Sequence, residues 1–129
     1  MSHTDVSIVC KDWISTVTID SPPDNYLDKE ILSKLNRTIS DMLASKEELR
    51  VVVLASKGAN FSAGIDYAGF VKMTKEEAGH FAEVGYNLLK HIENLPVPVI
   101  AAVKGQTRGA GLGLALAADI RIASQDALF

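Results

Sequence analysis

The amino-acid sequence predicts an α/β domain with a largely parallel β-sheet. Two short segments, 49–55 and 99–103, are almost continuously apolar, as in strands that are covered on both faces. Segments with apolar residues at helical spacing precede and follow them. The predicted order is therefore ββαβαβαβ, and this alternation of strands with helices is typical of a parallel sheet with crossover helices.

The first two predicted strands form a hairpin. Residues 6–11 and 14–19 alternate apolar and polar side chains around Asp12-Trp13, which is the pattern of paired strands joined by a tight turn. Cys10 falls in the apolar register, so we expect its thiol to be buried or half-buried. As the only cysteine it forms no internal disulfide, and no histidine clusters with it at metal-ligand spacing, so no metal is expected.

Capping signals and periodicity predict the helices. Asp28 can cap the first long helix, and Thr74 with Glu77 has the spacing of a capping box for the second, which Pro96 ends. A third segment, 109–118, is apolar on every side and predicts a helix that is buried all round. The apolar faces of the two long helices consist of Ile31, Leu32, Leu35, Ile39, Met42 and Leu43, and of Phe81, Val84, Leu88, Ile92 and Leu95.

The composition is that of a single globular domain. The chain has 129 residues, of which 47% are hydrophobic and 22% charged, and a formal net charge of −3. Its basic residues are scattered, which argues against a nucleic-acid partner. The first residues lack the features of a signal peptide, and no apolar run reaches the roughly 18 residues of a membrane span. A reducing, cytoplasmic compartment without membrane contact is the expectation.

Two segments rich in small residues follow predicted strands. One is 61–66, and the other is 105–111. Ligands of α/β domains bind beyond the carboxyl ends of strands, so we expect both segments to face one pocket. Small side chains let a ligand approach the backbone, and the free N–H groups at the start of the 109–118 helix can meet a negatively charged oxygen.

Phosphate binding is the main alternative for these glycines, and the residue spacing argues against it. Gly58 and Gly64 are separated by five residues and followed by Ile65, whereas a P-loop has four residues between its glycines and then Gly-Lys. Gly109 and Gly111 have Leu114 where a dinucleotide-binding fingerprint needs glycine or alanine. Both phosphate motifs are therefore absent.

Taken together, the two segments resemble the crotonase superfamily, the enoyl-CoA hydratase/isomerase family. The matching motifs are Phe61-Ser-Ala-Gly-Ile-Asp66 and the stretch 98–123, with Pro22-Pro-Asp-Asn25 before them and Ser124-Gln-Asp-Ala-Leu-Phe129 after them. The resemblance implies a spiral of ββα units. It covers residues 1–129 as the amino-terminal half of one acyl-CoA-binding domain, so we expect the chain to be incomplete as a functional unit, and the working protein to form trimers or hexamers.

The resemblance also implies a role for individual residues. The backbone N–H groups of Ala63 and Ala110 would hold the thioester oxygen of an acyl-CoA and stabilise an enolate, and no cofactor is implied beyond the coenzyme A of the substrate. Lys29 or Lys57 would meet coenzyme A phosphates, although plain solvated lysines are the alternative. Tyr67, Val71 and Met73 would line or cover the acyl pocket, with Phe70, or would belong to the ordinary core before Thr74. The residues expected to bind substrate are Tyr26, Leu27, Ser62, Gly64, Ile65, Asp66, Phe70, Gly109 and Gly111.

One position departs from the family pattern. Hydratases of the family carry a glutamate where this sequence has Gly113, and a glycine cannot transfer a proton. This departure favours a double-bond isomerase, which works with a single acid or base. Asp66 can instead cap a short helix, and Asp119 is expected to be a structural hydrogen-bonding group. A hydratase proper, a non-catalytic acyl-CoA-binding homologue, and an unrelated domain whose glycines serve packing all remain open.

Overall fold

The structure, a computed structural model, describes residues 4–45 and 48–129. Its centre is a five-stranded sheet in the order β1-β2-β3-β4-β5, in which β1 and β2 are antiparallel and the remaining pairs are parallel. This arrangement confirms the predicted α/β class and the largely parallel sheet. The strands are β1 (Asp5–Lys11), β2 (Ile14–Asp20), β3 (Val51–Ser56), β4 (Val99–Val103) and β5 (Ile120–Ala123).

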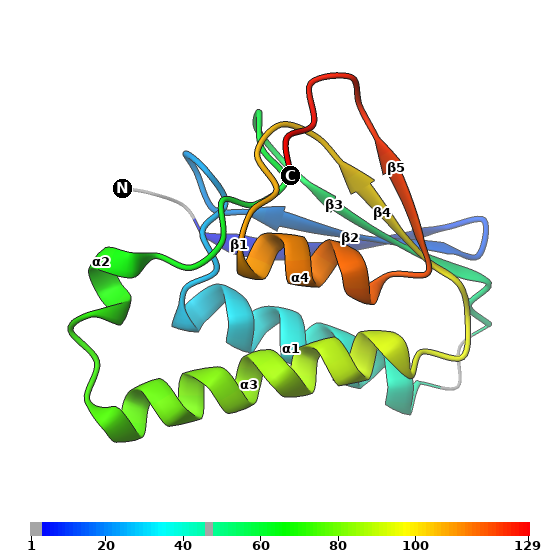
Figure 1. Cartoon of the computed structure of the whole chain (residues 1–129). Coiled ribbons are helices and arrows are strands. Elements are labelled where there is room, and N and C mark those ends of the chain that lie inside the picture. The colour runs from blue at the N-terminus through cyan, green and yellow to red at the C-terminus, as the bar shows by residue number, and fades with distance from the viewer. Residues whose placement is uncertain (1–3, 46–47) are drawn as a thin grey trace.

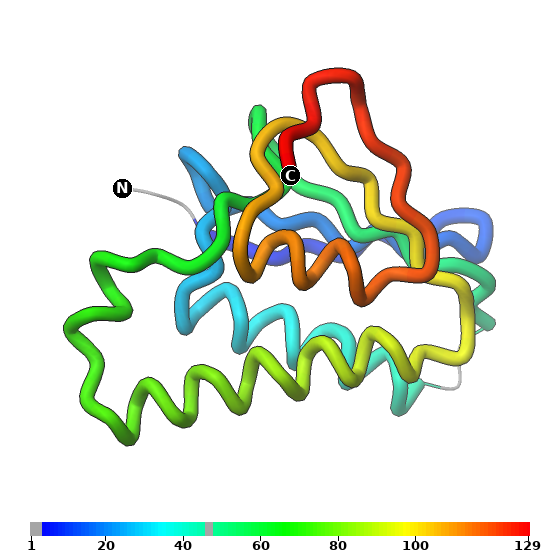
Figure 2. The backbone as a smooth tube through the Cα atoms, in the orientation of Figure 1, coloured from blue at the N-terminus to red at the C-terminus, as the bar shows by residue number. Residues whose placement is uncertain are grey.

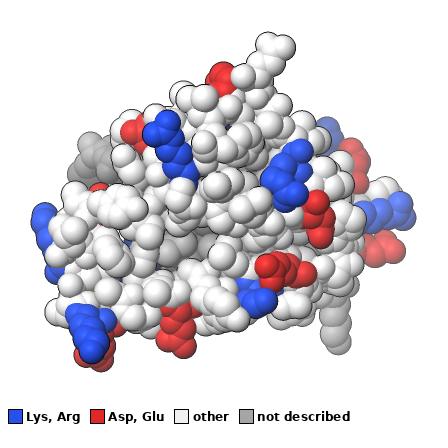
Figure 3. Space-filling model, in the orientation of Figure 1, with Lys and Arg blue, Asp and Glu red and all other residues white. Residues whose placement is uncertain are grey.

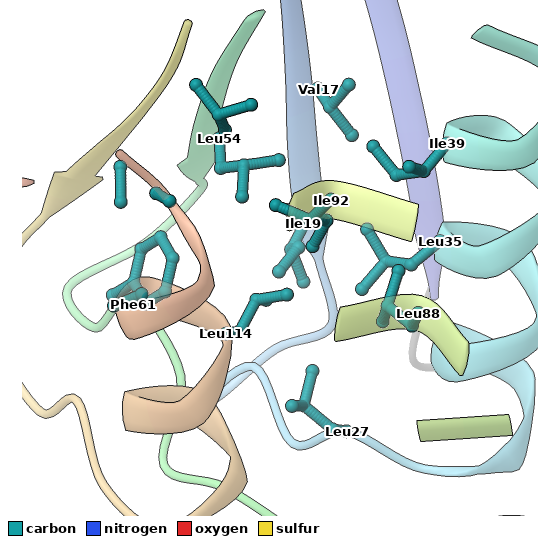
Figure 4. Close-up of a cluster of buried hydrophobic side chains, with 14 of the residues drawn as sticks. Val17, Ile19, Leu27, Leu35, Ile39, Leu54, Phe61, Leu88, Ile92 and Leu114 are labelled. Atoms are coloured by element: carbon teal, nitrogen blue, oxygen red, sulfur yellow. The ribbon is translucent and has the colours of Figure 1, made fainter. Parts of the chain in front are cut away.

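The helices lie on one face of the sheet (Figure 1). They are α1 (Lys29–Ala44), the short α2 (Tyr67–Phe70), α3 (Lys75–Glu93) and α4 (Ala110–Ala117). The core fills the space between this face and the helices, as Figure 4 shows for a cluster of fully or almost fully buried side chains. These include Val17, Ile19, Leu54 and Phe61 from the sheet side, and Leu35, Ile39, Leu88, Ile92 and Leu114 from the helices.

Both long helices begin where the sequence predicts. The Asp28 carboxylate accepts the Ile31 N–H at 2.9 Å and so caps α1. At the start of α3 the Thr74 hydroxyl accepts the Glu77 N–H at 3.1 Å, while the Glu77 carboxylate accepts the Thr74 N–H at 2.8 Å. This reciprocal pair is the predicted capping box, which satisfies two backbone donors that the helix itself leaves free.

The hairpin is also confirmed, but its free thiol lies in an unexpected place. Asp12 and Trp13 form the turn with positive φ angles of 52° and 63°, and the Arg50 guanidinium lies 4.8 Å from the Trp13 ring centroid. Cys10 is exposed, so the prediction of a buried or half-buried thiol is wrong. The reason is that β1 is an edge strand, and its last four residues, 8–11, are all exposed.

The apolar helix α4 is not buried all round among the described residues. Gly111, Leu114 and Ala115 are buried, but the Leu116 side chain is 59% exposed. A Cβ atom added at Gly113 would have no atom within 4 Å. One side of α4 packs on the core, and another side faces open space.

The loops that follow the parallel strands lie side by side at one edge of the sheet. Isolated parallel bridges join Tyr26 to Gly64, Ser62 to Thr107, and Gln106 to Leu128. Figure 2 shows the last of these contacts, where the C-terminal segment runs beside the loop that leads into α4. The two glycine-containing segments of the sequence are thereby brought together.

Candidate functional site

Backbone hydrogen bonds join the two glycine-containing segments directly. The Phe61 N–H donates to the Lys104 carbonyl at 2.7 Å, and the Arg108 N–H donates to the Ser62 carbonyl at 3.1 Å. Gly64 has a φ of +96°, and a Cβ atom there would lie only 2.8 Å from the Arg108 carbonyl oxygen. Only glycine fits both the backbone conformation and this close approach. The predicted convergence of 61–66 and 105–111 is therefore confirmed.

Asn60 fixes three loops relative to one another. Its side-chain N–H₂ group donates to the Asp24 carboxylate at 2.8 Å, and its side-chain oxygen accepts the Gln106 N–H at 2.8 Å. The Asn60 carbonyl in turn accepts hydrogen bonds from the Ser56 hydroxyl at 2.9 Å and from the Asn25 amide at 2.7 Å. The loops after β2, β3 and β4 all meet at this residue, which the sequence reasoning did not identify.

Asn25 adds a second set of contacts to the same framework. Its side chain is almost fully buried. The side-chain oxygen accepts the Ser21 N–H at 2.8 Å, and the side-chain N–H₂ group donates to the Lys57 carbonyl at 2.8 Å as well as to Asn60. The positive φ of Asn25, 53°, suits asparagine better than most residues. This residue holds the 21–27 loop against the loop that follows β3.

Several backbone N–H groups of segments 61–66 and 105–111 have no acceptor in the part of the chain that the structure describes. They include those of Ile65, just after the Gly64 turn, and of Ala110, the first residue of α4. The Ala110 nitrogen would lie 3.5 Å from a Cβ atom at Gly64, so the two segments present these groups close together. As an N-terminal amide of a helix, the Ala110 N–H also benefits from the helix dipole in attracting a negatively charged oxygen.

The hydrogen bonding of Ala63 argues against its predicted role. The Ala63 N–H donates to the Asp24 carbonyl at 3.0 Å and is therefore already satisfied inside the protein. The family resemblance points to Ala63 by its place in the motif, which carries no information on the tertiary contact to Asp24. A free N–H of this segment lies two residues later, at Ile65.

Ile65 and Ala110, which carry these N–H groups, both line one cavity of about 270 Å³. Its walls come from the 21–27 loop, the segment after β3, and the helices α1, α3 and α4. Helix α3 contributes Phe81, Ala82, Gly85, Tyr86, Leu88 and Leu89. The other elements contribute Leu27, Leu32, Ile65, Phe70, Ala110, Gly113 and Leu114.

The cavity is apolar. None of the residues that line it carries a charge, and the Tyr86 hydroxyl is the one polar side-chain group among them. In Figure 3 this face has a hollow near its middle, with uncharged residues around it and charged residues farther out. An apolar surrounding strengthens hydrogen bonds to a charged oxygen because water does not compete for it.

The two candidate carboxylates have structural partners. The Asp66 carboxylate accepts the Ala68 N–H at 3.1 Å and caps α2, and Asp66 is not among the cavity-lining residues. The Asp119 carboxylate accepts the Val99 N–H at 2.8 Å. The capping and structural interpretations of these residues are confirmed, and the described residues bring no carboxylate to the cavity wall.

The predicted substrate-binding residues separate into two groups. Leu27, Ile65 and Phe70 line the cavity, together with Ala110. Ser62 does not: it is fully buried, and its hydroxyl donates to the Asn25 carbonyl at 2.7 Å and accepts the Gly64 N–H at 3.2 Å. This arrangement argues against a contact of the Ser62 side chain with substrate. The predicted residues that position the backbone without lining the cavity are Tyr26, Gly64, Gly109 and Gly111.

The outlying candidates lie away from the cavity. Tyr67 and Val71 are 71% and 75% exposed, and Met73 borders a separate surface hollow near Asp28 and Lys72. These three residues do not line the apolar cavity, because α2 directs only Phe70 toward it.

Both lysines predicted to meet coenzyme A phosphates are engaged in ion pairs. The Lys29 ammonium lies 3.0 Å from the Glu77 carboxylate, and the Lys57 ammonium lies 2.9 Å from the Asp20 carboxylate. Both lysines are more than half exposed, so a phosphate could compete for them at small cost.

The sequence does not predict that residues of α3 line the cavity. The apolar stripe that predicted this helix marks its core-facing side. Ala82, Gly85, Tyr86 and Leu89 form a neighbouring stripe at spacings of three and four residues. Their helical spacing could have indicated a second buried stripe. The stripe is hard to recognise in the sequence because Ala82 and Gly85 are small and only weakly hydrophobic.

Neither a membrane span nor a metal-binding cluster is found among the described residues. None of their helices has the length and apolar content needed to cross a bilayer. They also contain no group of three or more histidine, cysteine or acidic residues placed to hold a metal ion.

Comparison with curated proteins shows related chains that act on coenzyme A thioesters. The Bacillus subtilis protein named "Probable enoyl-CoA hydratase" is 36% identical over 123 residues, which cover 95% of this chain and 47% of that protein. The mitochondrial methylglutaconyl-CoA hydratase of Mus musculus is 39% identical over 104 residues, covering 80% of this chain and 33% of that protein. The chain thus spans half or less of the length of these relatives.

Solved structures show the same fold. A protein of the enoyl-CoA hydratase/isomerase (crotonase) type from Legionella pneumophila superposes with a TM-score of 0.87 at 32% identity, covering 97% of this chain and 49% of that one. The enoyl-CoA hydratase of Bacillus anthracis gives a TM-score of 0.87 at 29% identity, covering 95% and 48%. Residues 10–129 match the Enoyl-CoA hydratase/isomerase family. With this match over almost its whole length, the chain belongs to the enoyl-CoA hydratase/isomerase family of the crotonase superfamily.

Proposed function

We propose that this chain binds an acyl-CoA thioester and stabilises the enolate formed next to the thioester carbonyl. The observation that carries the proposal is that Ile65 and Ala110, whose N–H groups are unpartnered, line one apolar cavity. The thioester oxygen would accept a hydrogen bond from each. In this proposal Ile65 replaces Ala63 as the first donor, and Ala110 keeps its predicted role.

The physical basis is preorganisation. Both donors belong to the main chain and are held in place by the contacts of Gly64 with Arg108 and by the Asn25 and Asn60 networks. They need no rearrangement when negative charge builds up on the oxygen. In well-studied acyl-transfer enzymes, one such donor lowers the activation barrier by about 3–4 kcal/mol. The size of this effect depends on exclusion of water.

The reaction that we propose is double-bond migration in an enoyl-CoA. Gly113 borders the cavity and has open space around it, where a hydratase of the family has a glutamate. Since the described cavity residues hold no carboxylate, the two-carboxylate route for adding water lacks one of its members here. A single acid or base elsewhere in the protein would move the proton between the two carbons.

Hydration is the second candidate, because the relatives reported above are named hydratases. The two candidates are separated by incubating the complete protein with a 3-enoyl-CoA and with a 2-enoyl-CoA. Migration of the double bond without water addition supports the isomerase, and a 3-hydroxyacyl product without migration supports the hydratase. Binding without either product would identify a non-catalytic acyl-CoA-binding protein.

The donor assignment can be tested by amide NMR spectroscopy on the ¹⁵N-labelled chain. Butyryl-CoA, which is saturated and does not react, should shift the amide protons of Ile65 and Ala110 to lower field, and free coenzyme A should not. The Ala63 amide is the internal control because it is already bonded to Asp24. A shift at Ala63 with none at Ile65 and Ala110 would refute the assignment.

A further inference from the structure

Two glycines within helices line the apolar cavity, although close packing does not require glycine at either position. They are Gly85 in α3 and Gly113 in α4. A Cβ atom at Gly113 would have no atom within 4 Å, and one at Gly85 would meet only the Leu32 Cδ1 atom at 3.9 Å, an ordinary contact. Glycine is among the poorest helix formers. The space that a side chain at Gly85 would fill belongs to the cavity.

The size of the cavity limits what can enter it. Its volume is about 270 Å³, which lies below the roughly 300–1,000 Å³ of pockets that enclose a whole drug-sized ligand. A coenzyme A moiety is larger than this volume, so we place only the acyl group between α3 and α4. A compact acyl group fits within this volume, and a long chain would extend beyond the apolar walls.

The chemistry of the walls adds a second limit. The α3 side presents Phe81, Ala82 and Leu89, and the opposite sides present Leu27, Phe70 and Leu114. A carboxylate on the acyl group would lie against apolar walls with no cation among the lining residues to pair with it. An unpaired charge in such surroundings is strongly disfavoured.

From these observations we infer that the site selects compact, uncharged acyl groups, short or branched, and that Gly85 is a residue that determines this specificity. The inference rests on the proposed function, since it assumes that the acyl group of a coenzyme A thioester occupies the cavity. Because Gly85 has no side chain, the space beside Leu32 stays unoccupied and can accommodate a branch of the acyl chain.

The first test measures the dissociation constants of the full chain for four compounds by calorimetry. Isovaleryl-CoA is compact and branched, hexadecanoyl-CoA is long, glutaryl-CoA carries a carboxylate, and free coenzyme A has no acyl group. Isovaleryl-CoA should bind at least tenfold more tightly than either of the other two thioesters. Equal binding of all three thioesters overturns the inference and leaves the proposed function standing. If no thioester binds more tightly than coenzyme A, the proposed function itself fails.

The second test compares Gly85→Leu with Gly79→Leu. Gly79 lies in the same helix, is exposed, and has open space around its Cβ position, so both variants replace a helix glycine and only one fills the cavity. Gly85→Leu should weaken isovaleryl-CoA binding at least tenfold and weaken it more than acetyl-CoA binding, while Gly79→Leu should change neither. Thermal unfolding of both variants verifies that they are folded. Unchanged isovaleryl-CoA binding in folded Gly85→Leu overturns the role of Gly85.

Discussion

A Cβ atom on Gly111 would lie 2.5 Å from the Ser62 carbonyl oxygen. The second residue of α4 therefore packs directly on the backbone of the segment after β3. That same carbonyl accepts the Arg108 N–H, so one peptide group of the first segment holds both the start of α4 and the loop before it. The relative position of the Ile65 and Ala110 N–H groups depends on this contact.

Replacing Gly111 by alanine should destabilise the protein by about 1–3 kcal/mol, the usual cost of inserting atoms into a tightly packed place. Gly113→Ala is the matched control in the same helix. Its Cβ atom enters open space, and alanine gains about 1 kcal/mol over glycine in a helix. Urea unfolding of both variants measures the difference. Equal stability changes of the same sign would show that the Gly111–Ser62 contact is not tight.

Asn25→Ala should lower the free energy of unfolding by about 3 kcal/mol. The change removes three hydrogen bonds from an almost fully buried side chain and leaves the Ser21 N–H without its acceptor, and each buried unsatisfied group costs about 1–3 kcal/mol. Asn94→Ala is the comparison, because the exposed Asn94 amide makes one hydrogen bond, to the Lys90 carbonyl. Its stability should change by less than about 0.5 kcal/mol. If Asn25→Ala loses no more stability than Asn94→Ala, the structural role given to Asn25 is contradicted.

The elements that the sequence predicts correctly are those controlled by local chemistry. Asp28 and Thr74 cap helices through residues three positions away, so the signal and its effect lie within one turn. The apolar spacing of α1 and α3 likewise follows from the geometry of a single helix burying one face. Cys10 shows the limit: alternation marks a strand, but its burial depends on which strands lie at the edge of the sheet.

The sequence predicts which segments form the candidate site, but it does not predict which backbone N–H groups are free there. Small residues after two parallel strands indicated correctly that 61–66 and 105–111 would meet. Which N–H group is free depends on a partner 39 residues earlier in the chain, the Asp24 carbonyl that occupies the Ala63 N–H. No local pattern encodes that contact. The Asn60 network, which joins three loops, is hidden from sequence for the same reason.

The capping box of α3 should make stability depend on pH in the acidic range. The hydrogen bond from the Thr74 backbone, followed by that from Lys29, lowers the pKa of Glu77 below its ordinary value of 4.5. A lowered pKa in the folded state means that the stabilisation is present above the unfolded pKa and is lost as pH falls through the folded one. The melting temperature of Glu77→Gln should therefore lie below that of the parent at pH 7, and the gap should narrow below pH 4.5.

Glu76→Gln provides the control for this titration. Glu76 also lies in the first turn of α3 but is not part of the capping box. Thermal unfolding followed by circular dichroism between pH 7 and pH 3 compares the two variants with the parent. A gap for Glu77→Gln that stays constant with pH, or that is matched by Glu76→Gln, would mean that the ionised Glu77 carboxylate adds nothing to the cap.

Introducing a carboxylate at position 113 should increase the rate of hydration of a 2-enoyl-CoA. Gly113 borders the cavity beside Ala110 and has open space around it, so a glutamate side chain can enter without displacing a neighbour. The apolar walls should raise the pKa of the new carboxyl group and favour the protonated form that an acid catalyst needs. General acid–base groups contribute about 10²–10⁴-fold to rates, so Gly113→Glu in the complete protein should hydrate a 2-enoyl-CoA at least about tenfold faster than the parent. Gly113→Gln has the same shape without the ionisable proton, and equal rates for the two variants would rule out proton transfer from this position.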